Sequence, residues 1–213
     1  DNTPIIIGET TPETKPVFIE RAQSVHAPIL FAEEEHLLQS SSVNETGERI
    51  YQTTDFAELK GELGGLCQLK NTNTLLSSIR QLKKIGYHLT EENVREGFAH
   101  VSKLTGLMGR WQKLEELPAL VCATGHNVGG ISYIVEQLKH QKYDRLHIVM
   151  GMVNDKDISG VLSMMPKDAI YYFTRADVKR ALPENELQAL AQQVGLQGQS
   201  YPNVKAAVEA AKQ

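Results

Sequence analysis

The chain has 213 residues, of which 41% are hydrophobic and 23% charged, and both fractions are ordinary for a globular protein. Its formal net charge of -4 gives no reason to expect nucleic-acid binding, which selects for basic surfaces. No apolar run approaches the roughly 18 residues of a membrane span, and no signal peptide is visible. Cys67 and Cys122 lie in apolar contexts without the spacing of a zinc site or disulfide framework. They predict buried thiols in a reducing compartment.

The first half of the chain is predicted to alternate short strands with helices. Residues 4–8 and 28–32 are apolar runs of strand length, and a Thr-Pro-Glu signal at residues 11–13 starts a helix that runs to about residue 26. The inward face of this helix is expected to carry Val17, Ile19, Ala22 and Val25. Residues 37–47 are polar and Ser-rich and predict a loop, whereas residues 49–59 alternate like antiparallel strands.

Two helices follow before the pattern changes near Gly106. Residues 71–85 have helical periodicity and end at Gly86 as a cap, and Thr90 starts a second helix. Beyond Gly106, parallel strands are predicted at residues 120–122, 146–150 and 170–173. Helices are predicted at residues 129–140, 157–165, 184–194 and 203–212. Strands this apolar, separated by helices, favour an α/β fold with a doubly wound sheet and a domain boundary near Gly106.

The segment at residues 123–130, Ala-Thr-Gly-His-Asn-Val-Gly-Gly, joins a predicted strand to a predicted helix. A polar, Gly-rich turn in this position is typical of α/β proteins that bind anionic ligands, because the helix points backbone N–H groups into the crevice at the strand end. His126 and Asn127 lie in this turn, where side chains can reach a ligand. By position alone, His126 could equally be a histidine whose hydrogen bonds are satisfied within the turn.

Three further segments are ambiguous when each is taken alone. The Gly64-Gly65 pair could be only a strand-to-helix turn with Asn71 as a cap, and Arg110 is typical of a solvated loop residue. The acidic side chains within residues 151–157 precede a predicted helix, and the helix dipole alone would explain them without any ligand. The sequence contains neither a Gly-x-x-x-x-Gly-Lys-(Ser/Thr) phosphate loop nor a Gly-x-Gly-x-x-Gly dinucleotide fingerprint.

Taken in chain order, these segments match a series of family motifs. Residues 63–71 match Leu-x-Gly-x-(His/Tyr)-Gln-x-x-Asn except at Cys67, and residues 107–110 match Trp-x-Gly-Arg except at Leu107. Residues 123–127 match Asp-x-(Ala/Gly)-His-Asn except at the first position. The motifs Gly-x-x-x-(Asp/Asn)-Lys-Asp and Thr-x-x-x-x-x-Arg-Ala are matched by residues 151–157 and 174–181. By these motifs the chain resembles the folylpolyglutamate synthases, often bifunctional with dihydrofolate synthase, of the Mur-ligase superfamily.

The resemblance implies a two-domain α/β organisation. Residues 1–105 correspond to the later part of the central, ATP-binding Mur-ligase-like domain. Residues 106–213 correspond to a Rossmann-like glutamate-ligase domain with a mostly parallel sheet, truncated before its last strand. The phosphate-binding loop and the magnesium ligands are expected upstream of the sequence, which begins with Asp1 rather than Met. The 213-residue chain alone is therefore expected to be inactive.

The chemistry that the resemblance implies is ATP-dependent amide formation in folate biosynthesis and one-carbon metabolism. The γ-carboxylate of a folate receives the γ-phosphoryl group of ATP, and the amino group of L-glutamate then attacks the acyl phosphate. Asn71 is implied near the adenine base, and Arg110 near the phosphates, where its planar fork suits phosphate oxygens. His126 is the implied catalytic residue, and with Asn127 it is expected near the incoming glutamate.

Position 123 departs from the pattern, because the family has there an Asp that binds the ribose hydroxyls and this chain has Ala123. The expected cofactors are ATP and Mg²⁺, and the expected partners are folate and L-glutamate, with dihydropteroate as a possible second acceptor. A cytoplasmic monomer that binds neither nucleic acid nor membrane is expected. Two alternatives stay open: another Mur-type ligase that joins an amino acid to a cell-wall precursor, and a non-catalytic Rossmann-like binding module.

Overall fold

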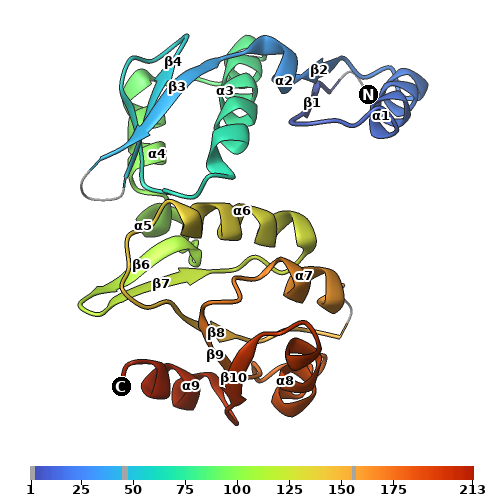
Figure 1. Cartoon of the computed structure of the whole chain (residues 1–213). Helices are drawn as coiled ribbons and strands as arrows, with labels where there is room; N and C mark the ends of the chain where they lie inside the picture. Colours follow the sequence, from blue (N-terminus) through green and yellow to red (C-terminus); the bar gives the residue numbers. More distant parts are fainter. Residues whose placement is uncertain (1–2, 45–47, 155–156) are drawn as a thin grey trace. The chain divides into compact units, whose positions relative to one another are not determined.

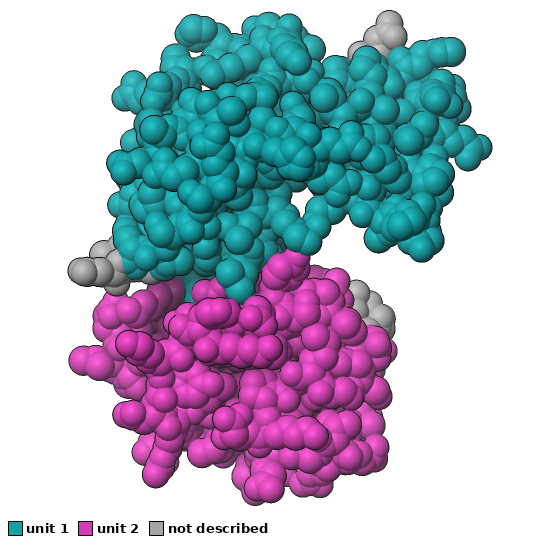
Figure 2. All heavy atoms as spheres, turned by 45° about the horizontal axis from the view of Figure 1, so that its top comes forward, with its two compact units in different colours: residues 1–112 teal, residues 113–213 magenta. Residues whose placement is uncertain are grey.

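The computed structural model describes residues 3–44, 48–154 and 157–213 (Figure 1). The chain divides into two compact units, Asp1–Gln112 and Lys113–Gln213, which are coloured separately in Figure 2. Each unit has its own buried core, so each is described by itself.

Unit 1 begins with a parallel β–α–β element. Strands β1 (Ile5–Ile7) and β2 (Ile29–Phe31) pair in parallel and are joined by helix α1 (Thr14–Ser24). The predicted helix is present but begins later than the Thr-Pro-Glu signal indicated. Thr11 nevertheless supports its first turn, because its hydroxyl accepts a hydrogen bond of 3.3 Å from the Thr14 backbone N–H. The expected inward placement of Val17 is wrong, since this side chain is 62% exposed.

The next sheet of unit 1 is antiparallel, with the strand order β3-β4-β5. Its strands are β3 (Leu38–Val43), β4 (Arg49–Thr53) and β5 (Leu59–Gly61). The alternation predicted for residues 49–59 is confirmed, because β4 alternates buried and half-buried side chains. The loop predicted over residues 37–47 is wrong for residues 38–43, which form strand β3, whereas residues 45–47 lie outside the described residues. This strand lies at the sheet edge, where backbone pairing with β4 holds it while its polar side chains face water.

The helices of unit 1 are α2 (Ala32–Glu35), α3 (Gln68–Lys84), α4 (Glu91–Ala99) and α5 (Val101–Thr105). Figure 1 shows α3 beside the sheet that contains β3 and β4, and α3 contacts β3. Thr90 caps α4 with a reciprocal capping box, and Gly86 follows α3 with a φ of +99°, as expected. The core of this unit comprises Leu37, Tyr51, Phe56, Leu59, Leu76 and Val94.

Strands β6 (Arg110–Glu116) and β7 (Ala119–Ala123) form a two-stranded sheet. Only residues 117–118 separate them, and so short a connection suits antiparallel strands alone. The sequence-based expectation that residues 120–122 form a strand is confirmed. The expectation that these residues belong to the parallel sheet is wrong. Among the described residues, β7 is hydrogen-bonded to β6 instead. Arg110 likewise begins a strand rather than lying in a plain loop.

Unit 2 contains a three-stranded parallel sheet with the order β10-β9-β8. Its strands are β8 (His147–Met150), β9 (Ile170–Phe173) and β10 (Gln197–Ser200). The helices are α6 (Val128–Lys139), α7 (Ile158–Met164), α8 (Glu184–Gln193) and α9 (Val204–Ala211), close to the predicted ranges. The predicted α/β fold with a parallel sheet in the second half is confirmed. Strand β10 was not predicted, because its Gln-Gly-Gln-Ser sequence has low strand propensity.

Packing against β9 explains why β10 forms. Gly198 lies opposite Tyr171 in the register, and a Cβ on this glycine would collide with the Tyr171 carbonyl oxygen. Tyr171 is fully buried, and its hydroxyl donates to the Pro166 carbonyl at 2.5 Å. Burial also raises the pKa of this hydroxyl, which keeps it a neutral donor. The close approach at Gly198 therefore comes from tertiary packing rather than local propensity.

The structure also bears on the cysteines and on membrane-spanning helices. Both cysteines are free thiols, but they are half-buried rather than fully buried as expected. Within the described ranges, no helix combines the length and apolar character needed to cross a membrane.

Candidate functional site

The turn at residues 124–127 connects β7 to α6, as the sequence predicts. Asn127 is the N-cap of α6, and its Oδ1 accepts a hydrogen bond of 2.7 Å from the Gly130 backbone N–H. This bond satisfies one backbone donor of the first helical turn. His126 is exposed, and its Nδ1 lies 3.2 Å from the Thr124 carbonyl oxygen. If that contact is a hydrogen bond donated by Nδ1, Nε2 is left as an acceptor facing solvent.

Two glycines set the shape of this turn by approaching each other closely. A Cβ placed on Gly125 would lie 2.5 Å from Ile134 Cδ1 and 3.2 Å from the Gly130 carbonyl carbon. A Cβ on Gly130 would in turn lie 3.4 Å from the Gly125 Cα. A Cβ on Gly129, by contrast, would meet only Asn127 Oδ1, at 3.8 Å. The turn therefore needs glycine at position 125 for space, and not at position 129.

We expect Gly125→Ala to destabilise unit 2 by about 1–3 kcal/mol, because the added methyl overpacks the contact with Ile134 and Gly130. The matched variant Gly129→Ala should be neutral or stabilising by up to about 1 kcal/mol, because alanine has the better helix propensity. Urea denaturation of the two variants measures the difference. Equal effects on the free energy of unfolding would contradict the steric role of Gly125.

A second group of candidate residues lies in unit 1, at the start of α3. Asn71 is exposed in the first turn of this helix, and its side-chain amide donates to Gln68 Oε1 at 3.1 Å. The sequence left Asn71 as a possible cap, but α3 already begins at Gln68, so Asn71 lies inside the helix. Its side chain is held by the preceding turn and is oriented outward.

Arg110 lies in the same unit, where β6 begins, and is exposed. The backbone on either side has positive φ values, +74° at Gly109 and +58° at Trp111. A side-chain bond supports this bend, since the Gly109 N–H donates to Gln112 Oε1 at 3.0 Å. A Cβ on Gly65 would lie 3.6 Å from the Trp111 Cβ, which is van der Waals distance. The loop before α3 and the segment carrying Arg110 are therefore adjacent, which sequence spacing did not reveal.

The loops that follow β8 and β9 form the third region. Gly151 follows β8, and a Cβ there would lie 2.9 Å from the Thr174 carbonyl oxygen. The Asn154 N–H donates to the Arg180 carbonyl at 3.0 Å, which ties the two loops together. Asp157 is the N-cap of α7, with Oδ1 accepting from the Gly160 N–H at 2.8 Å. The motif residues Asp155 and Lys156 lie outside the described residues.

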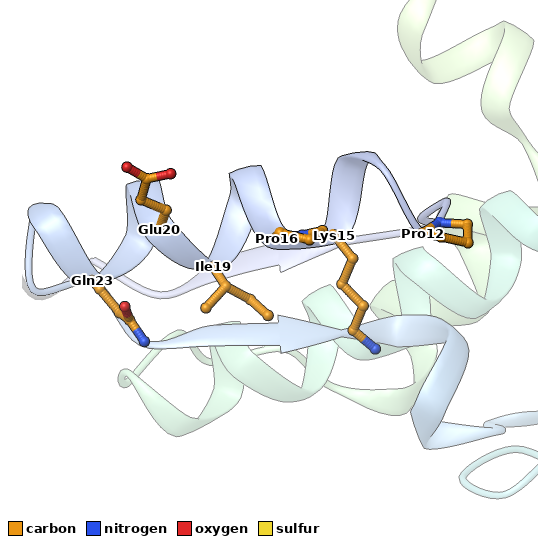
Figure 3. Close-up of a pocket in the computed structure, with 6 residues that line it drawn as sticks. All are labelled: Pro12, Lys15, Pro16, Ile19, Glu20 and Gln23. Atoms are coloured by element: carbon orange, nitrogen blue, oxygen red, sulfur yellow. The ribbon is translucent and has the colours of Figure 1, made fainter.

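Two cavities are lined by described residues of unit 1. One, of about 530 Å³, lies on α1, with the lining side chains drawn in Figure 3. The other, of about 340 Å³, lies between α3 and α4 and is mostly apolar. Among the described side chains, no group of three His, Cys, Asp or Glu could hold a metal ion.

A family model and two curated relatives point to the same group of enzymes. Residues 109–213 match the family described as "Mur ligase, glutamate ligase domain". The folylpolyglutamate synthase of Lacticaseibacillus casei is 22% identical over 88% of this chain and 44% of its own length. The dihydrofolate synthase/folylpolyglutamate synthase of Escherichia coli is 28% identical over 98% of this chain and 46% of its own length. The chain thus spans less than half the length of these curated relatives.

Solved structures share the fold. The Mycobacterium tuberculosis folylpolyglutamate synthase complexed with ADP aligns with a TM-score of 0.83 at 21% identity, over 98% of this chain and 47% of that one. An E. coli FolC structure in complex with DHPP and ADP aligns with a TM-score of 0.72 at 23% identity, over 98% of this chain and 46% of that one. Residues 109–213 thus match the Mur ligase glutamate ligase domain family, within a chain similar to part of the folylpolyglutamate and dihydrofolate synthases.

Proposed function

We propose that this chain forms part of an ATP-dependent ligase that adds L-glutamate to the γ-carboxylate of folates. The observation that carries the proposal is the β7–turn–α6 segment, in which exposed His126 lies beside a capped helix start inside a glutamate-ligase-type domain. Related solved structures include one with Mn, AMPPNP and L-glutamate bound and others with ADP. These ligands are consistent with the same chemistry for this chain.

The reaction has two balanced steps. ATP supplies a phosphoryl group to the folate γ-carboxylate, which releases ADP. The glutamate amino nitrogen then bonds to the acyl carbon, phosphate leaves with the electron pair of the broken C–O bond, and the nitrogen loses a proton. Most of the protein's contribution to such a reaction is positioning and charge neutralisation.

Each candidate residue has a role suited to its position. The exposed guanidinium of Arg110 binds phosphate oxygens in a two-pronged contact, and the Asn71 amide, oriented by Gln68, lies near the adenine. His126 accepts a hydrogen bond from the glutamate ammonium group or takes up its proton through Nε2. Asn127 orients the start of α6 toward the same substrate.

The proposed organisation follows from these roles. Residues 1–105 are the later part of an ATP-binding domain and residues 106–213 are the glutamate-ligase domain. Arg110 begins β6, close to the proposed boundary between the two domains. Mg²⁺ is proposed as the metal cofactor that accompanies ATP. A cytoplasmic monomer is proposed, with folate and L-glutamate as its partners.

Glutamate ligation tests the proposal directly. The protein expressed from its complete open reading frame should convert a folate monoglutamate and L-glutamate to the diglutamate, with ADP formed in equal amount. Mass spectrometry of the folate product and a coupled ADP assay measure the two products. His126→Gln should retain ATP binding and lose most of the ligation rate, because glutamine lacks a titrating nitrogen.

The 213-residue chain alone is the comparison arm and should form no product, because its sequence contains no phosphate-binding loop of the Gly-x-x-x-x-Gly-Lys-(Ser/Thr) type. Ligation by the isolated chain would contradict that expectation. ADP formation that depends on a cell-wall precursor instead of a folate would overturn the proposed substrate.

A further inference from the structure

A buried cation lies behind the loop that precedes α3. Arg49, on β4, is only 4% exposed. Its Nη1 donates to Ser41 Oγ at 3.1 Å, and its Nη2 donates to the Gly64 carbonyl at 2.9 Å. Among the described residues, its Nε has no hydrogen-bond partner and the guanidinium forms no ion pair with a carboxylate. Buried charges are usually paired, because desolvation of the charged group is costly.

The Gly64 carbonyl is the point at which this side chain holds the loop. Gly64 and Gly65 are both buried, although glycine has no side chain to anchor a loop by packing. A charge-assisted hydrogen bond from guanidinium to carbonyl is among the stronger protein hydrogen bonds. Arg49 therefore fixes the backbone of the loop where side-chain packing cannot.

The same loop is connected on both sides to the candidate ATP-binding residues. On one side the Gln68 N–H donates to the Gly65 carbonyl at 3.0 Å, which begins α3, and Gln68 in turn holds the Asn71 amide. On the other side Gly65 lies next to Trp111, the residue after Arg110, since a Cβ added to this glycine would lie 3.6 Å from the Trp111 Cβ. A shift of the loop would consequently move the supports of both Asn71 and Arg110.

We propose that Arg49 is a positioning residue for the nucleotide site: through the Gly64 carbonyl it sets the loop that orients Asn71 and Arg110 together. The proposal rests on the proposed function, since it takes these two residues to contact ATP. It assigns no ligand contact to Arg49, whose guanidinium is enclosed by the protein. It also gives a structural role to a buried arginine that has no paired carboxylate among the described residues.

Trp111 provides a direct readout, because it is the only tryptophan among the 213 residues. In the 213-residue chain, Arg49→Met keeps the aliphatic volume and removes the bond to Gly64. The emission maximum of Trp111 should move to longer wavelength and acrylamide quenching should increase, while the far-UV circular dichroism stays unchanged. The matched control is Ser41→Ala, which removes the other hydrogen bond of the same guanidinium and should leave the Trp111 signal as it is.

The functional readout uses the protein expressed from its complete open reading frame, titrated calorimetrically with Mg–AMPPNP. Arg49→Met should raise the Kd about tenfold, on the scale of one charge-assisted hydrogen bond, and Ser41→Ala should not change it. If Arg49→Met does not fold, Arg49→Lys replaces it, because lysine keeps the charge but not the two-pronged donor geometry. It should shift both readouts in the same direction by a smaller amount.

The outcomes separate this inference from the proposed function. An unchanged Trp111 signal in a folded Arg49→Met or Arg49→Lys variant overturns the positioning role. A shifted Trp111 signal in a protein whose unsubstituted form binds no Mg–AMPPNP supports the Arg49–Gly64 linkage and overturns the proposed function. Equal losses of nucleotide affinity in Arg49→Met and Ser41→Ala indicate general destabilisation and overturn the inference.

Discussion

Ala123→Asp should tighten ATP binding by roughly 10- to 100-fold, or about 1.4–2.8 kcal/mol, in the protein expressed from its complete open reading frame. Ala123 is the exposed last residue of β7, immediately before the turn that carries His126. The sequence contains no other acid between Glu116 and Glu136, so no neighbouring carboxylate along the chain can replace one there. A carboxylate at position 123 would accept charge-assisted hydrogen bonds that alanine cannot make.

A matched acid on the same strand provides the control. Ala119 is also exposed and begins β7, so Ala119→Asp adds the same charge away from the turn and should leave the affinity unchanged. Calorimetric titration with a non-hydrolysable ATP analogue compares both variants with the unsubstituted protein. Equal affinities for Ala123→Asp and the unsubstituted protein would mean that the ribose is bound elsewhere.

The second large effect is expected in the core of unit 2. Phe173 is fully buried at the end of β9, and its ring stacks on Tyr171 with centroids 5.6 Å apart. Phe173→Ala should lower the free energy of unfolding by about 3–5 kcal/mol, because it removes buried surface and leaves a cavity. That loss is a large part of the total stability of an ordinary domain, which is about 5–15 kcal/mol.

Phe173→Leu separates the loss of volume from the loss of the aromatic ring. This variant keeps most of the buried apolar volume and should cost less than about 1.5 kcal/mol. Urea denaturation followed by circular dichroism measures both variants. A Phe173→Ala loss as small as that of Phe173→Leu would show that the core around β9 collapses readily onto the vacated space.

The strands that were predicted and those that were missed differ in what stabilises them. The segments around β8 and β9 are apolar runs, and burial on the sheet requires that pattern, so the sequence alone predicts them. Strands β3 and β10 are polar edge strands whose side chains carry little of the signal. Their pairing depends on a neighbouring backbone, which cannot be located before the chain is folded.

The candidate site shows the same division. The sequence alone indicated the turn with His126 and Asn127, because a strand, a Gly-rich turn and a helix signal are local patterns. The motif order also indicated Asn71 and Arg110, 39 residues apart along the chain by their numbers. Their roles as ATP and glutamate ligands remain predictions, as does the acid implied at position 123.

Only the tertiary structure decided how unit 1 holds its two candidate residues. Gly65 lies next to Trp111, and Arg49 donates a buried hydrogen bond to the Gly64 carbonyl, so that segments far apart in sequence are brought together. Nothing in the periodicity around residue 49 distinguishes a buried arginine from the solvated arginine that a strand edge usually carries. Sequence patterns report local geometry and burial, whereas the partner of a long polar side chain is determined by which backbone the fold brings within hydrogen-bonding distance.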